Sequence, residues 1–159
     1  IGNEVFKLVF SMKYGYPAKA LKVLAFLEIG DKRTFRLLVR SLPRRVWTLK
    51  PQLVAETIMA CVAVNVEPRV TYHRLKGSRV YRLLAGQLTT NVGAIGSKTV
   101  CDVFAALAKV EQREPELTLA TEAVVVQRSY KFHAEHVVSL LRDFAALGHA
   151  SPDLRSLLN

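Results

Sequence analysis

The chain has 159 residues, half of them apolar, and a formal net charge of +10 at pH 7. This length and composition exclude a disordered chain and predict one compact domain or a short array of repeats, 1–159. No apolar run reaches the ~18 residues of a membrane-spanning helix, so no membrane span is expected. The excess of positive charge indicates an anionic partner, usually a nucleic acid.

The positive charge is concentrated in the first part of the chain. Residues 1–90 hold 16 Lys and Arg against 5 Asp and Glu, whereas residues 91–159 hold 7 against 8. Such a division predicts one basic surface for an anionic partner and leaves the half 91–159 for contacts with neighbouring proteins. The alternative is that the cations only cover solvated helix faces.

The first 50 residues read as basic helical hairpins. Apolar residues recur at spacings of three and four in 3–12 and again in 18–29, which predicts two amphipathic helices. Pro17 suits the first turn of the second helix, and Gly30 is a plausible C-terminal cap for it. Asp31 is placed to cap the N-terminus of a third helix, 32–42.

The helix predicted over 32–42 has one apolar face and one arginine face. Its arginines recur at spacings of three and four, and more cations follow in the connection to Pro51. The guanidinium group matches the geometry of phosphate, so this strip is predicted to contact a nucleic-acid backbone. The candidates are Arg33, Arg36, Arg40, Arg44, Arg45, Trp47 and Lys50. Trp47 has two readings, stacking on a base or, more commonly, covering the seam between two hairpins.

A repeated pattern follows, in which an apolar run and a short polar break precede a proline. Leu53, Val100 and Val137 each stand fifteen residues before Pro68, Pro115 and Pro152. This recurrence predicts three hairpins in 51–159, with Ser97 and Ser151 as helix caps. The expected fold is all-α, with antiparallel helical hairpins stacked into a short α-solenoid.

The prolines are unequally spaced. Pro68 and Pro115 are 47 residues apart, whereas Pro115 and Pro152 are 37 apart. The Gly- and Thr-rich segment 88–96 accounts for the ten extra residues if it is a loop insertion. The Val-rich segment 123–127 has strand propensity, but its helical surroundings favour a helix.

A second basic cluster surrounds the first of these prolines. It comprises Arg69, Arg74, Lys76, Arg79 and Arg82. Tyr72, His73 and Tyr81 lie between these cations, which favours contact with duplex or folded RNA. The alternative is that some of the cations cap helix carbonyls or pair with Glu56 and Glu67.

No motif for catalysis, cofactor or metal binding is supported. Segment 93–99, GAIGSKT, lacks the spacing of a phosphate-binding loop, and His133 and His136 lack the spacing of a zinc-protease motif. These histidines are expected to be helix-cap or surface residues. Cys61 and Cys101 each fall in an apolar run and are expected to be buried free thiols.

The segments VFAALAKVEQREPELTLA and LLRDFAALGHASPDLRSLL resemble organellar helical-repeat RNA-binding proteins. The resemblance is to the octotricopeptide and heptatricopeptide classes and to the helical region of FAST-kinase-like proteins. It implies a non-catalytic mitochondrial protein, a ribosome subunit that contacts ribosomal RNA through residues 33–82. The alternative is a protein-binding scaffold subunit of a large organellar complex without RNA contact.

Overall fold

The structure, a computed structural model, describes residues 15–28, 30–64 and 78–158, and over these residues it is all-α. These ranges contain eight α-helices and no strand. The helices are α2 (Tyr16–Phe26), α3 (Lys32–Ser41), α4 (Pro51–Ala63), α5 (Ser78–Thr89), α6 (Ser97–Lys109), α7 (Pro115–Gln127), α8 (Ala134–Ala146) and α9 (Pro152–Ser156). The prediction of an all-α fold is confirmed, and so is the helix over 123–127.

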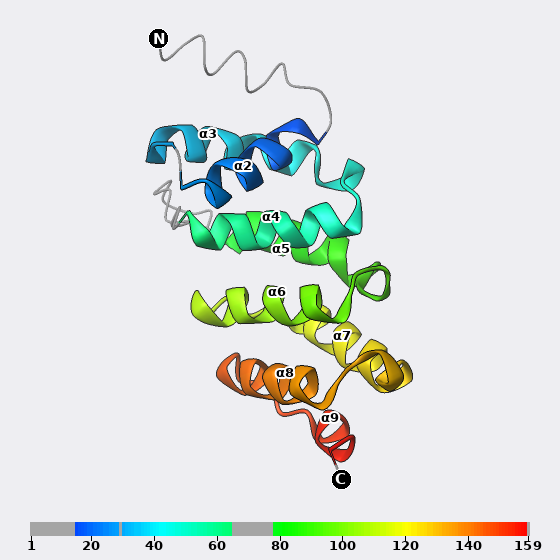
Figure 1. The fold of residues 1–159 in the computed structure, drawn as a ribbon. Helices are drawn as coiled ribbons and strands as arrows, with labels where there is room; N and C mark the ends of the chain where they lie inside the picture. Colours follow the sequence, from blue (N-terminus) through cyan, green and yellow to red (C-terminus); the bar gives the residue numbers. More distant parts are fainter. Residues whose placement is uncertain (1–14, 29, 65–77, 159) are drawn as a thin grey trace.

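The helices pack in chain order in two rows. The first row runs α2 on α4, α4 on α6 and α6 on α8, and in the second row α5 packs on α7 and α7 on α9. Figure 1 shows α2 and α3 at one end of this ladder and α8 and α9 at the other. Each helix therefore finds its main partners one or two elements away along the chain.

Short 3-10 turns fix the unit that repeats. They are η1 (Leu42–Arg44), η2 (Val46–Thr48), η3 (Val92–Ala94) and η4 (Ser129–Lys131). The first residues of α5, η3 and α6 each lie 37 residues before the first residues of α7, η4 and α8, respectively. In the same way, the first residues of α3, η2 and α4 each lie 46 residues before the first residues of α5, η3 and α6; these two spacings are called the shifts of 37 and 46. The repeating unit is thus helix, 3-10 turn, helix.

The predicted loop insertion at 88–96 is wrong. Leu88 and Thr89 belong to α5, and η3, which follows them, has its counterpart in η4. The connections 27–31, 110–114 and 147–151 have five residues each. The prediction had equated Pro68 with Pro115, and Pro68 lies outside the described residues.

The register predicted for the first repeat is displaced by one residue. The shift of 46 makes Val54, not Leu53, the counterpart of Val100 and Val137. All three valines are buried, whereas Leu53 is only partly buried. The buried positions therefore follow the helix–turn–helix unit rather than the prolines.

The core is a continuous row of apolar side chains between the helices. Near its C-terminal end, Phe104 of α6 and Phe144 of α8 are both buried and meet edge to face, with ring centroids 4.7 Å apart. This geometry adds to the free energy gained from burying two large aromatic groups. The pair is a principal contact holding α8 on α6.

Local signals predicted most helix starts. Pro17, Pro51, Pro115 and Pro152 all lie in the first turn of a helix. Asp31 caps α3, since its side chain accepts a hydrogen bond of 2.6 Å from the Thr34 backbone N–H.

Both predicted serine caps differ from the structure. Ser97 is the first residue of α6 rather than its cap, which is Gly96. Ser151 occupies the N-cap position of α9, but its hydroxyl donates to the Glu122 carboxylate instead of accepting from the helix. A neighbouring carboxylate on α7 thus competes successfully with the local capping bond.

The five-residue connections share a left-handed residue. The second residue of each has a positive φ: 55° at Glu28, 54° at Glu111 and 79° at Gly148. After α6 the Gln112 N–H donates to the Leu107 carbonyl at 3.0 Å, and after α8 the His149 N–H donates to the Phe144 carbonyl at 2.8 Å. This is the Schellman motif, which favours glycine at the left-handed position.

Replacing Glu111 with glycine is therefore expected to raise the free energy of unfolding by about 0.5–1 kcal/mol, because a side chain in the left-handed region is strained. The reverse change, Gly148→Ala, is the matched control and should lower it by about 1 kcal/mol. Urea unfolding of both variants measures the two shifts. A loss of stability in Glu111→Gly would contradict the assignment.

Candidate nucleic-acid interface

Helix α3 presents the arginine face that the sequence predicts. Phe35 and Leu38 are buried, whereas Arg33, Arg36 and Arg40 on the other side are exposed. Lys32 at the start of the helix is also exposed. We did not single it out from the sequence, although its position next to Arg33 was a visible signal.

The charge on this face is not neutralised within the described part of the chain. In residues 15–28, 30–64 and 78–158, no carboxylate forms an ion pair with Arg33, Arg36 or Arg40. The acid at the start of the helix, Asp31, is engaged in the helix cap. The Thr34 N–H, with a smaller contribution from the charge of Arg33, lowers the pKa of Asp31 from its ordinary value. The guanidinium groups therefore remain available for an anion.

The connection from α3 to α4 extends this surface. Leu42, Val46 and Leu49 are buried and anchor the two 3-10 turns. Arg44, between Leu42 and Val46, and Lys50, directly after Leu49, are exposed.

Trp47 lies on the same connection. Its side chain is 65% exposed, so it does not cover a seam between hairpins, and the structural reading of this residue is wrong. The seam is filled instead by its smaller neighbours Val46 and Leu49. The indole face is accessible to a stacking partner.

Arg45 differs from its neighbours. It is only half-exposed and already takes part in an interaction of its own. Of the seven candidates between Arg33 and Lys50, Arg45 is the one that is not fully exposed.

The second predicted cluster is only partly visible. Arg69, Arg74 and Lys76 lie outside the described residues, as does the side chain of Arg79, and so do Tyr72 and His73. Tyr81 is 3% exposed, so it cannot stack on a base. Burial raises the pKa of Tyr81 well above its ordinary value.

Arg82 faces acidic groups rather than open solvent alone. It lines a small groove of about 250 Å³ between α5 and the start of α7, together with Glu114 and Glu116. Burial raises the pKa of Glu114, while the hydrogen bond from Gln112 and the charge of Arg82 act against that rise. Arg82 is thus an exposed cation with acidic neighbours, and it forms no ion pair among the described residues.

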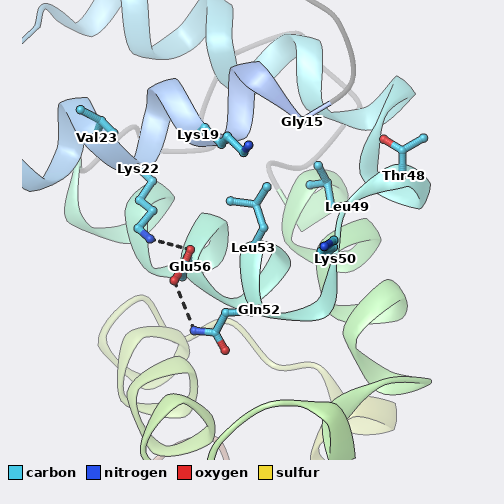
Figure 2. A pocket seen from close by; sticks show the side chains of 10 residues that line it. All are labelled: Gly15, Lys19, Lys22, Val23, Thr48, Leu49, Lys50, Gln52, Leu53 and Glu56. Atoms are coloured by element: carbon cyan, nitrogen blue, oxygen red, sulfur yellow. Dashed lines mark hydrogen bonds and ion pairs between the residues drawn. The ribbon is translucent and has the colours of Figure 1, made fainter.

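Two lysines that we did not consider from the sequence lie on α2. Lys19 and Lys22, with Lys50, surround a groove between α2 and α4 (Figure 2). Their spacing of three residues in a predicted helix was the available signal. The groove itself joins segments about 30 residues apart, so no local pattern showed it.

With this geometry in hand, we compared the chain with known proteins. It matches no protein-family model, no curated protein and no solved structure. Its function is therefore inferred from its own residues and from the resemblance of its repeat pattern to that of organellar RNA-binding proteins.

Other chemistry is limited in the part of the chain that the structure covers. Within it, no three His, Cys, Asp or Glu side chains are grouped to hold a metal ion, and no helix is long and apolar enough to cross a membrane. His133 and His136 form a cap at the start of α8, where the His133 backbone N–H donates to His136 Nδ1 at 3.3 Å. The prediction that they are helix-cap or surface residues is confirmed.

Both cysteines are buried free thiols, as predicted. Burial disfavours the charged thiolate and raises the pKa of Cys61 to about 12 and that of Cys101 to about 11. The thiolate is the nucleophilic form, so native protein at about pH 8 should react with a disulfide reagent such as DTNB far more slowly than unfolded protein. Both thiols should react at once in guanidinium chloride. Rapid labelling of the native chain would contradict this burial.

Proposed function

We propose that this chain is a non-catalytic RNA-binding protein of the α-solenoid type, built from stacked antiparallel helical hairpins. The observation that carries the proposal is the face of α3. Arg33, Arg36 and Arg40 are exposed there without a carboxylate partner among the described residues. Arg44, Trp47 and Lys50 continue that surface along the connection to α4.

The arrangement suits RNA for a physical reason. Arginines one helical turn apart present several donors to successive phosphates, and such contacts hold a nucleic acid without reading its sequence. An exposed indole beside them offers a stacking platform for a base, which single-stranded and looped RNA can present. We call the residues Lys32, Arg33, Arg36, Arg40, Arg44, Trp47 and Lys50 the α3 basic surface.

We further propose that the chain is a subunit of a mitochondrial ribosome and contacts ribosomal RNA. The support for this is the resemblance of its repeats to organellar RNA-binding proteins and the uneven charge. The half 91–159 would then face neighbouring proteins. Leu119 and Tyr130, which are 57% and 80% exposed, offer apolar contacts in that half.

The same exposed residues support the second candidate, a scaffold subunit that touches only proteins. The two candidates differ in what lies against α3. Ultraviolet crosslinking of the native assembly, followed by mass spectrometry of RNA-linked peptides, separates them. Crosslinks within 32–50 are expected if RNA lies there. Their absence, with protein crosslinks to the same peptides instead, would favour the scaffold.

A further inference from the structure

A groove between α2 and α4 shares Lys50 with the α3 basic surface but none of its other residues. It has a volume of about 570 Å³, and the segment 48–50 forms part of its lining. Binding sites for ligands and peptide anchors commonly have volumes of about 300–1,000 Å³. Figure 2 shows Leu53 rising from α4 toward α2, with Lys19 above it and Lys22 reaching down to Glu56.

The floor of the groove is apolar. Leu49 and Leu53 form it, and Val23 of α2, which is 52% exposed, borders it. The stripe of α2 that carries Lys19, Lys22 and Val23 continues one turn further to Phe26, which is 85% exposed. Apolar surface therefore runs along the groove and beyond it.

The rim of the groove is positively charged. Lys19, Lys22 and Lys50 line it, and Glu56 is the one carboxylate among its described lining residues. That carboxylate is already engaged, because Lys22 Nζ lies 2.7 Å from Oε2 and Gln52 Nε2 donates to Oε1 at 3.3 Å. In the described part of the chain, Lys19 and Lys50 form no ion pair, so the groove carries two lysines without a carboxylate partner. Lys19 Nζ lies 5.7 Å from the centre of the exposed Tyr16 ring.

We infer that this groove binds an acidic peptide segment of a partner protein, with an apolar side chain seated on Leu49 and Leu53. An occupant must bury apolar surface and place carboxylates near Lys19 and Lys50. The chain's own residues 1–14 contain two Lys and one Glu, the same net sign as the groove, so they are the weaker electrostatic fit. A nucleic acid would set its phosphates against a leucine floor, which offers them no hydrogen bond.

Selection of a displayed library of random peptides, each about 12 residues long, on the full chain tests this inference. Peptides that bind the original chain but do not bind the variant Lys19→Glu/Lys50→Glu are kept. They should share two or more Asp or Glu beside a Leu or Phe, and their affinity should fall at least about tenfold in that variant. The control Lys109→Glu/Lys131→Glu, with the same charge change on exposed residues elsewhere, should bind them unchanged. Failure to recover such peptides, or recovery of basic ones, would overturn the inference.

A photocrosslinker identifies the occupant directly. Val23→p-benzoylphenylalanine should crosslink to a selected peptide. Crosslinking instead to residues 1–14 of the same chain, or to a second copy, would assign the groove to that occupant and overturn the inference. Because Lys50 also belongs to the α3 basic surface, the single variant Lys19→Glu is the one used for RNA: a loss of RNA affinity in it, without any peptide binding by the original chain, would also overturn the inference. Peptide binding should survive the loss of Arg33, Arg36 and Arg40, so the two proposals can fail separately.

Discussion

Replacing Arg33, Arg36 and Arg40 together with glutamine is expected to lower the affinity for RNA by about 100-fold, at about 1 kcal/mol for each lost phosphate contact. The reason is that all three are exposed on one face of α3 without an ion pair among the described residues. Each phosphate contact also releases bound counterions. The slope of log affinity against log salt should therefore become shallower by about 3.

The matched control is the triple variant Lys109→Gln/Lys131→Gln/Arg155→Gln. It removes the same charge from exposed residues of the second half. Its RNA affinity should change by only a few fold through the weaker overall field. Both variants should unfold within about 0.5 kcal/mol of the original chain, because surface substitutions rarely do more. Equal losses of affinity in the two variants would contradict a localised interface and indicate attraction by net charge alone.

Replacing Phe144 with alanine is expected to lower the free energy of unfolding by about 3–5 kcal/mol, or to prevent folding outright. Phe144 is fully buried, meets Phe104 at 4.7 Å and also contacts the His149 ring at 5.6 Å. Its removal would leave a cavity between α6 and α8 and loosen the connection to α9. Urea unfolding followed by circular dichroism measures the change.

Two other variants make this prediction specific. Phe144→Leu keeps most of the volume and should cost less than about 1.5 kcal/mol. Phe26→Ala removes an equally large group from a side chain that is 85% exposed, so its effect should stay within about 0.5 kcal/mol. If Phe26→Ala destabilised the chain as much as Phe144→Ala does, the assigned core would be wrong.

Local sequence signals predicted the helices and their starts well. Asp31 caps α3 because its carboxylate needs only a backbone N–H three residues away. Prolines fit the first turn for an equally local reason, since they have no N–H to leave unpaired. The two faces of α3 followed from helical periodicity alone.

The predictions that failed concern features that contacts between repeat units determine. Taking Leu53 as the counterpart of Val100 was wrong, because equivalent buried positions are set by packing on neighbouring helices and not by the distance to a proline. Tyr81 and Trp47 have similar sequence surroundings, rich in cations, yet one is buried and the other exposed. Only the position of neighbouring elements separates these two outcomes. For the same reason the groove between α2 and α4 was not predicted.

Packing in chain order also determines how the molecule should respond to tension. The five-residue helix α9 contacts chiefly α7 and α8, so a pulling force on the ends of the chain should detach it first. Later steps would peel away one helix–turn–helix unit at a time. Each unit of 37 residues would release roughly 120 Å of chain. A chain packed in this order would act as a compliant linker, which yields in small steps while its basic end stays folded.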